Sequence, residues 1–289
     1  AQGARLLPDG GGYYAYRLAY STTTDKTADQ VYAIGQREVA RIRGQMEGIR
    51  AKTGFPGDLA AFFKFGRDDG QFYFSNDAAG RAEYIAVTEA MMERTRKLLP
   101  GYFGLLPKAN LEVKRVEAFR ERPGGPAHYL TGDPDGSVPG TYYLHLANMN
   151  ALNRVVIQST AYHEGIPGHH LQSSIALESK TLPTFRTGVW YSSYGEGWAL
   201  YAEHLAKEMG VYDDAYSDFG RLALEMLRAI RLVVDTGIHD RGWSEQQAVD
   251  FFLANSAMPE SIVRSEVRRY FVWPGQATSY TIGMLNILE

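Results

Sequence analysis

Apolar residues recur every three or four positions along most of the chain, which is the spacing of one buried helix face. The longest run covers residues 28–52, with apolar positions at Val31, Ile34, Val39, Ile42, Met46 and Ile49. The polar cluster Thr22–Asp25 before it is a candidate N-cap. Similar runs predict helices over residues 58–65, 78–99, 153–164, 195–208, 216–240, 244–255, 260–270 and 275–288. The pattern predicts a mainly α fold.

The spacing changes between residues 111 and 148. Leu111–Phe119 alternates imperfectly between apolar and polar positions, and segments rich in Tyr and Leu follow at 127–130 and 141–147. The turn-forming sequence Gly132–Gly136 separates these two segments. We therefore predict a small antiparallel sheet embedded among the helices.

The chain has 289 residues, which is enough for one large domain with a substantial core. No repeat or low-complexity linker divides it. We predict a single domain with a helical part at 1–110, the sheet at 111–148, and a second helical part at 149–289.

Composition excludes several classes of protein. Apolar residues make up 45% and charged residues 22% of the chain, as in ordinary globular domains. The net charge of −3 argues against a nucleic-acid partner, which would need a clustered basic excess. There are no cysteines, so neither a disulfide nor a thiolate ligand is available. No apolar stretch is long enough to span a bilayer.

The chain begins Ala1-Gln2-Gly3 rather than with Met, and no signal-like apolar core follows. We expect a processed chain or the C-terminal portion of a longer protein, so that an export signal would be missing from this sequence. The protein is expected to be soluble, whether exported or cytoplasmic. Composition leaves the oligomeric state open.

Three of the seven histidines lie within the run His163–His170, which begins His-Glu. A hydrolytic zinc site needs about three His, Asp or Glu ligands and a carboxylate that takes the proton of water. The usual helical spacing is His-Glu-x-x-His, but here the next histidines, His169 and His170, come six and seven residues after His163. Pro167-Gly168 should make the helix bulge or break, and this could bring His169 back to His163. Solvent-exposed histidines at a helix break are the alternative interpretation.

A third ligand should come from a neighbouring helix. Glu196 and Glu203 lie seven residues apart, and so on one helix face. Glu196 lies between Gly195 and Gly197, which allow close approach of a metal ion or a backbone. Glu203 is two turns further on, where it could bond a ligand histidine. Taken alone, two such acids would more often be exposed.

Arg231, Asp235 and His239 share one face of a further predicted helix. A ladder of surface ion pairs is the ordinary interpretation of this spacing. Apolar neighbours favour burial instead, and buried charges usually have a partner or a function. We predict that His239 reaches the substrate, that Asp235 orients it, and that Arg231 also contacts the substrate.

The sequence resembles the bacterial DUF885 family, whose members are predicted zinc metallopeptidases and are typically much longer. The resemblance covers nearly the whole chain and is carried by Thr22–Asp25, His163–Gln172, Gly195–Glu203, Arg231–His239 and Pro274–Tyr280. That family is similar to helical zincins such as carboxypeptidase Taq and thimet oligopeptidase, which carry His-Glu-x-x-His and a Glu on a later helix. The resemblance therefore implies a zincin-like fold.

The same resemblance implies roles for individual residues. Matching Gly168–Leu171 to the Gly-His-Ala-Leu of helical zincins favours His169 over His170 as the second ligand. Tyr280 matches a late Tyr-bearing segment and would donate to the oxyanion. The strand Thr141–Leu146, with Tyr143, would be a sheet edge along which the substrate backbone is added.

We therefore expect a peptidase with one Zn²⁺ bound by His163, His169 and Glu196. Glu164 would act as the general base and then protonate the leaving amine. One alternative is a metal-dependent hydrolase acting on an amide or ester of a small metabolite. The other is a non-catalytic binding module with a vestigial site. Length preference and the choice between exo- and endopeptidase action stay open.

Overall fold

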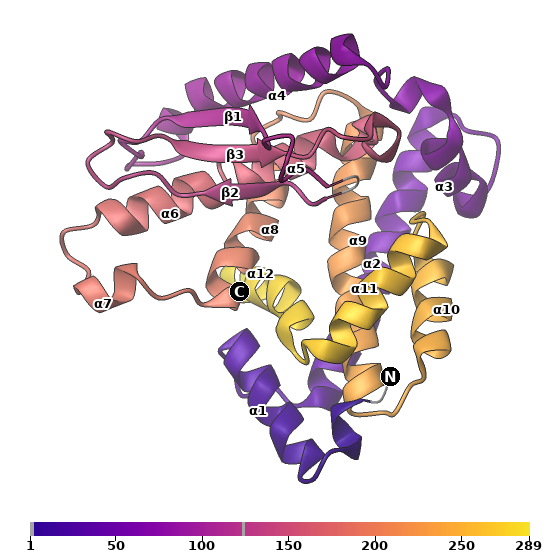
Figure 1. The fold of residues 1–289 in the computed structure, drawn as a ribbon. Coiled ribbons are helices and arrows are strands. Elements are labelled where there is room, and N and C mark those ends of the chain that lie inside the picture. The colour runs from indigo at the N-terminus through magenta and orange to yellow at the C-terminus, as the bar shows by residue number, and fades with distance from the viewer. Residues whose placement is uncertain (1–2, 123–124) are drawn as a thin grey trace. The chain divides into compact units, whose positions relative to one another are not determined.

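The computed structural model describes residues 3–122 and 125–289, and it divides the chain into two units interleaved along the sequence. The helical unit contains the residues up to Asp68, Tyr191–Gly197 and Leu222–Glu289. The sheet unit contains Asp69–Trp190 and Trp198–Arg221. The predicted mainly helical fold with one small sheet is confirmed over the described residues (Figure 1).

The helical unit is built from long helices and the ends of two helices that continue into the sheet unit. Its helices are α1 (Gly10–Thr22), α2 (Ala28–Thr53), α3 (Leu59–Asp68), the first turns of α8 (Ser192–Glu208), most of α9 (Ala215–His239), α10 (Glu245–Asn255), α11 (Glu260–Val272) and α12 (Ser279–Leu288). Short 3₁₀ turns at Ala4–Leu6 and Gln276–Thr278 precede α1 and α12.

Helix α2 begins at a capping box. The Thr27 side chain accepts from the backbone N–H of Gln30, and the Gln30 side chain accepts from the backbone N–H of Thr27. The predicted cap at Thr22–Asp25 is therefore wrong, because Thr22 is the last residue of α1. The buried face of α2 packs Val31 against Leu232 of α9 and Ile282 of α12.

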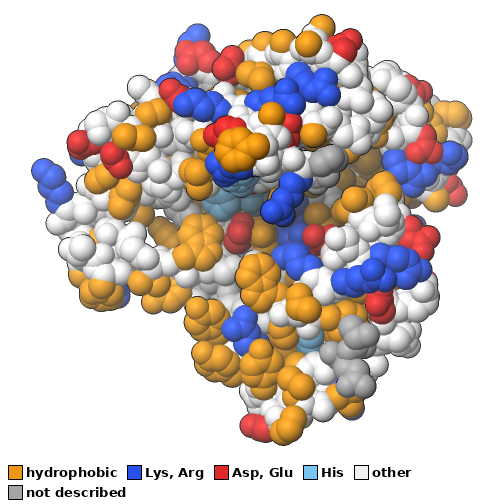
Figure 2. All heavy atoms as spheres, viewed as in Figure 1, with side chains coloured by type: hydrophobic (Ala, Val, Ile, Leu, Met, Phe, Trp, Pro, Cys, Tyr) orange, Lys and Arg blue, Asp and Glu red, His pale blue; other side chains and the backbone are white. Residues whose placement is uncertain are grey.

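Helix α1 was not expected from the sequence. Its first turn is Gly10-Gly11-Gly12, which has low helix propensity, so the segment resembles a loop. Tertiary packing holds it instead, because Tyr14 and Leu18 are buried. Three other tyrosines of the helix are exposed, and Figure 2 shows hydrophobic side chains gathered over this part of the molecule.

The sheet unit surrounds its strands with helices. Its elements are α4 (Ala78–Leu98), β1 (Leu111–Arg115), β2 (His128–Leu130), β3 (Gly140–Leu144), α5 (Ile157–Glu164), α6 (His169–Glu178), α7 (Thr184–Thr187), the remainder of α8 and the start of α9. Short 3₁₀ turns lie at Gly70–Phe72, Leu99–Gly101, Met149–Ala151 and Arg154–Val156. Figure 1 shows α4 running beside β1 and α6 beside β2.

The three strands are ordered β1-β3-β2. Strand β3 pairs in parallel with β1 and antiparallel with β2, so the sheet is mixed rather than antiparallel throughout. The prediction that Thr141–Leu146 forms an edge is wrong, because β3 is the central strand. Tyr142 and Leu144 of β3 are buried in the core of the unit with Tyr162 of α5.

Among the described helices, none is both long and apolar enough to cross a bilayer.

Candidate metal centre

The run His163–His170 forms a helix break. Helix α5 ends at Glu164, and α6 begins at His169 after a four-residue connection. Gly168 packs against the end of α5 so closely that a Cβ there would lie 2.0 Å from the carbonyl oxygen of His163. Only glycine fits at this position, and the predicted bulge or break is confirmed as a complete break.

The break brings His163 and His169 together. Their ring centroids are 4.8 Å apart with the planes at 84°, an edge-to-face arrangement. Both rings are buried. The six-residue spacing, which would separate the two side chains in a straight helix, therefore becomes a close pair because the chain turns between them.

Glu203 of α8 orients the first histidine. Its Oε1 lies 2.8 Å from Nδ1 of His163, and its side chain is 1% exposed. Because an ionised carboxylate only accepts hydrogen bonds, Nδ1–H donates and Nε2 keeps its lone pair. This arrangement of a carboxylate behind a histidine is typical of metal sites, where it fixes the tautomer and the ring orientation.

His170 lies in a different environment. Its Nδ1 is 3.0 Å from the Tyr129 hydroxyl of β2, and the Ala109 backbone also bonds the ring. Burial lowers the pKa of His170 to about 4, so the ring is neutral at ordinary pH. The histidine thus joins α6 to β2. Tyr129 was not predicted as a functional residue, because no motif or spacing in the sequence relates it to His170.

Two tryptophans hold the segment around His169. Trp198 of α8 donates from Nε1 to the carbonyl oxygen of Pro167 at 2.9 Å, and the Trp190 ring lies 5.8 Å from the His169 ring. Trp198 therefore links α8 directly to the helix break. From the sequence, Trp198 indicated only that the helix carrying Glu196 and Glu203 is largely buried.

Glu164, the predicted general base, is the last residue of α5 and is partly exposed. Burial raises the pKa of Tyr142 well above its usual range, and the charges of Tyr84 and Glu164 raise it further. Tyr142 is fully buried on β3, and its hydroxyl has no hydrogen-bond partner among the described residues. An uncharged tyrosine therefore lies within electrostatic reach of the Glu164 carboxylate.

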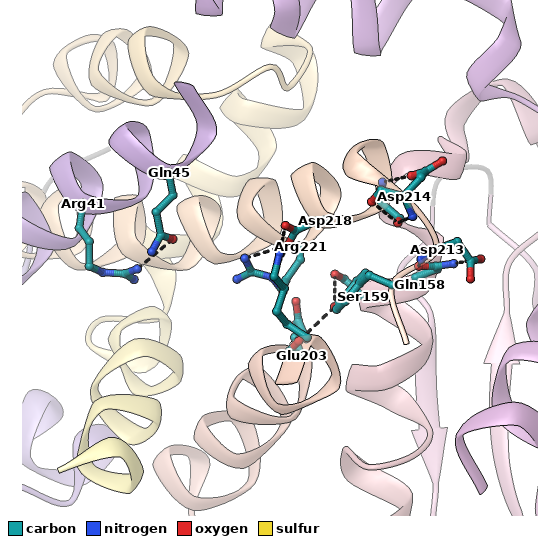
Figure 3. Close-up of polar contacts among 12 residues, drawn as sticks. Arg41, Gln45, Gln158, Ser159, Glu203, Asp213, Asp214, Asp218 and Arg221 are labelled. Carbon is teal, nitrogen blue, oxygen red and sulfur yellow. Dashed lines mark hydrogen bonds and ion pairs between the residues drawn. The ribbon is translucent and has the colours of Figure 1, made fainter. Parts of the chain in front are cut away.

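A polar network supports α8 near Glu203. The Tyr212 hydroxyl donates to the carbonyl oxygen of Glu203 at 3.1 Å and lies 2.8 Å from the Ser159 hydroxyl of α5. Figure 3 shows the neighbouring contacts, in which Asp218 pairs with Arg221 and Gln158 with Asp213. The Tyr212 and Asp213 contacts tie α5 and α8 to the connection between α8 and α9 within the sheet unit.

Glu196 lies on the first turns of α8, in the helical unit. These turns pack closely on α12: the Ser192 and Ser279 hydroxyls are 2.7 Å apart, and a Cβ on Gly197 would lie 2.6 Å from Gly283. Glu196 and Tyr280 are both positioned between these two contacts along their helices. On α8 itself, Glu196 is two turns before Glu203, on the same face.

Tyr280 lies beside arginines of α9. Burial raises the pKa of its hydroxyl, the Glu196 carboxylate raises it further, and Arg231 and Arg228 partly oppose them. The guanidinium carbon of Arg231 is 4.9 Å from the centre of the Tyr280 ring. Tyr280 therefore stays protonated at working pH and can donate a hydrogen bond.

Arg231 is buried and ion-paired. Its guanidinium donates to Tyr270 at 3.1 Å and to Glu266 at 2.9 Å. Burial lowers the pKa of Arg231, but the charges of Tyr270, Glu266 and Tyr280 outweigh burial and raise it. Arg231 thus stays charged next to Tyr280, and its predicted contact with the substrate stays a prediction.

His239 and Asp235 have structural partners. Nδ1 of His239 accepts from the backbone N–H of Ala4, and Nε2–H donates to the carbonyl oxygen of Tyr270, both at 2.9 Å. Asp235 accepts from the Tyr14 hydroxyl and from the backbone N–H of Gly275. With both ring nitrogens bonded to backbone, His239 has no atom left for a substrate, and we give it no role in the chemistry.

Tyr143 projects from β3 on the face opposite to buried Tyr142, because successive strand residues alternate. Its ring stacks on His128 of β2, with centroids 5.3 Å apart. Its predicted contact with the substrate stays a prediction.

The described residues of the sheet unit suit a zinc ion. Zinc favours imidazole and carboxylate donors. His163 and His169 are a close imidazole pair, and Glu203 bonds Nδ1 of the His163 ring. The ligand set expected from the sequence stays a prediction.

The fold and site define a mainly helical protein with a candidate metal centre at a helix break. The chain belongs to the bacterial protein family of unknown function DUF885, whose model matches residues 1–289.

Solved structures are similar over the whole chain. A "putative lipoprotein" from Colwellia psychrerythraea is 35% identical with a TM-score of 0.94, over 99% of this chain and 49% of that one. A "putative lipoprotein of unknown function" from Shewanella oneidensis shares the fold at 19% identity, with a TM-score of 0.80 over 100% of this chain and 54% of that one. The chain thus spans about half of each. No curated protein matches it.

Proposed function

We propose that the protein is a zinc-dependent peptidase whose single Zn²⁺ is held by His163, His169 and Glu196. The observation that carries the proposal is the His163–His169 pair with Glu203 bonded to Nδ1 of His163. A carboxylate behind a buried histidine of this kind is typical of a metal ligand.

Two further observations support the ligand set. Glu196 lies on the same face of α8 as Glu203, two turns before it. His170, the alternative ligand, is engaged with Tyr129. The donor set of two imidazoles and one carboxylate is that of catalytic zinc sites with an open position.

A zinc ion at this site would supply a Lewis acid that polarises the carbonyl and makes water acidic. Glu164, directly after a ligand histidine, accepts the proton of the attacking water and delivers it to the leaving amine. Tyr280, kept protonated by burial, donates to the developing oxyanion. His163 is held in its tautomer by Glu203 throughout.

The edge strand of the sheet favours a peptide as the substrate. Strand β2 is an edge strand in the order β1-β3-β2, and it lies beside α6, whose first residue is His169. An extended peptide can be added to such an edge through backbone hydrogen bonds, largely independently of its sequence. The similar protein from Colwellia is called a "putative lipoprotein", which favours action outside the cytoplasm.

Matched histidine variants test the metal site. The purified protein should contain one zinc per chain, and chelation should abolish peptide hydrolysis until zinc is restored. His169→Gln should lose zinc, whereas His170→Gln should retain it, with both measured by metal analysis. Zinc retained by His169→Gln and lost from His170→Gln would contradict the ligand set.

A substrate panel separates the remaining activities. Hydrolysis of peptides, but not of small-metabolite amides or esters, supports the peptidase. The reverse preference would favour the other class of hydrolase. Absence of zinc, with no hydrolysis after zinc is added, would favour a binding module.

A further inference from the structure

Three aromatic rings lie together on the face of the sheet that is turned away from the core. His128 of β2 pairs directly with Tyr143 of β3, and their rings stack with centroids 5.3 Å apart and an interplanar angle of 19°. His145, two residues after Tyr143, points to the same face, and its ring centroid is 5.7 Å from that of His128. We call Tyr143, His128 and His145 the ring cluster.

The two faces of the sheet differ in what covers them. On the inner face, Tyr142 of β3 is buried in the core, and Tyr129 of β2 contacts His170 of α6. On the outer face, His128 is half-buried and Leu130 is 50% exposed. A ligand can therefore reach the ring cluster from outside.

The ring cluster is ordered by backbone contacts. Tyr143 is on the central strand, where it pairs with Lys114 of β1 on one side and with His128 on the other. The backbone N–H of Arg122 donates to Nδ1 of His145 at 3.1 Å. Side chains that are already ordered lose little conformational entropy when a ligand binds to them.

The ring cluster ends at a free strand edge. Strand β2 is at one end of the order β1-β3-β2, and among the described residues it pairs with β3 alone (Figure 1). A peptide added to β2 would place one residue directly opposite His128, with Cβ atoms about 5 Å apart. Its alternate side chains would point to the inner face, toward α6 and its first residue His169, and the others to the outer face.

An aromatic side chain suits the position opposite His128. Tyr143 already lies against one side of the His128 ring, and a ring on the added peptide would lie against the other. Aromatic pairs gain stability beyond that of the apolar area they bury, whereas an aliphatic side chain gains only from area. The cross-strand neighbour therefore favours one class of residue at this position of the peptide.

We propose that His128, stacked on Tyr143, determines specificity by selecting substrates with an aromatic side chain at the position paired with it. His128 acts in binding and takes no part in the chemistry of hydrolysis. This inference rests on the proposed peptidase function, in which the substrate is added to the edge of β2.

A positional scan tests the preference. In N-acetylated hexa-alanine, a single Phe at one position should raise kcat/KM about 3- to 10-fold above that of the all-alanine peptide, because an aromatic pair is gained there. Asp placed at the same positions distinguishes ring stacking from attraction to a protonated histidine. Equal cleavage of all the Phe peptides, or a preference for Asp over Phe, would overturn the inference.

Variants of His128 assign the preference to the ring cluster. His128→Ala should reduce the ratio of Phe-peptide to all-alanine kcat/KM to about one, whereas His128→Phe should keep it because a ring is retained. Zinc content and thermal unfolding check that each variant is folded. The matched control is His204→Ala, a histidine of α8 beside Glu208, which should keep the wild-type ratio. An unchanged ratio in folded His128→Ala would contradict the assignment.

The two proposals fail in different ways. If no peptide is cleaved but calorimetry shows that the Phe peptide binds more tightly than all-alanine, and His128→Ala loses this preference, the peptidase proposal fails and the aromatic subsite stands. If peptides are cleaved with a ratio that does not depend on His128, the peptidase stands and the subsite fails. Neither cleavage nor preferential binding would overturn both.

Discussion

At the scale of single residues, side chains that are neighbours in the sequence differ in role because they have different contacts. His169 meets the His163 ring, whereas His170 meets Tyr129 and is kept neutral by burial. Glu203 would act through His163, because it holds Nδ1 of that ring in a hydrogen bond. In our proposal, therefore, the contacts of a residue, and not its type, decide whether it binds the metal or positions a metal ligand.

Glu203→Gln should weaken zinc binding. The amide cannot match the charge-assisted bond to Nδ1 of His163, and losing such a support typically costs 10- to 100-fold in metal affinity. A competition titration with a chelator measures the change. Glu208→Gln on the same helix is the control, since Glu208 is exposed beside His204. Equal zinc affinity of Glu203→Gln and the wild type would argue against His163 as a ligand.

Some of these residue roles could be predicted from the sequence. The helical spacing put Glu203 on the face of Glu196, two turns along, and the helix break was foreseen from Pro167-Gly168. The partners of His170 and His239 could not be predicted, because Tyr129 and the Ala4 backbone are brought to them only by tertiary packing.

At the scale of elements, the connection between α5 and α6 is the feature on which the site depends. Its four residues turn the chain so tightly that Gly168 lies against the last turn of α5. Trp198 holds the connection from α8 through the Pro167 carbonyl. The pairing of His163 with His169 follows from this turn.

Gly168→Ala should disturb both the fold and the site. Its Cβ would lie 2.0 Å from the carbonyl oxygen of His163, so the chain must shift, at a cost of about 3 kcal/mol. Thermal unfolding and zinc content measure the two effects. Gly188→Ala, where a Cβ meets nothing within 4 Å, should have little effect on either. Wild-type stability in Gly168→Ala would show that the connection is less tightly packed than described.

Helices and strands could be predicted where the local spacing of apolar residues matches the face that tertiary packing buries. Helix α2 follows its apolar spacing almost to the residue. Helix α1 was missed because its glycines oppose the helix and its burial is decided by distant partners. The central place of β3 was also missed, since strand order depends on long-range pairing that spacing does not encode.

At the scale of the whole molecule, the chain is two interleaved units joined by continuous helices. Helices α8 and α9 each belong to both units, and α8 carries both Glu196 and Glu203. The chain spans about half of its structural relatives. Charge pairs within the helical unit make its stability dependent on pH.

The stability contributed by Glu266 should be lost in acid. Its folded pKa is lowered to about 2 from the usual 4.5, so its contribution is present above 4.5 and is lost as pH falls toward 2. Glu266→Gln should cost about 2 kcal/mol near neutrality and progressively less on acidification. Urea unfolding at several pH values measures this. Glu260→Gln, exposed on the same helix, is the control. A cost that grows in acid would contradict the pairing with Arg231.

The central claim is that Glu164 performs general base catalysis beside a bound zinc ion. The most direct test is the rate of peptide hydrolysis by Glu164→Gln, measured together with its zinc content. We predict one zinc per chain, as in the wild type, and a rate lower by about 10²- to 10⁴-fold, because the variant lacks the base. Wild-type hydrolysis by the zinc-loaded variant would contradict the account.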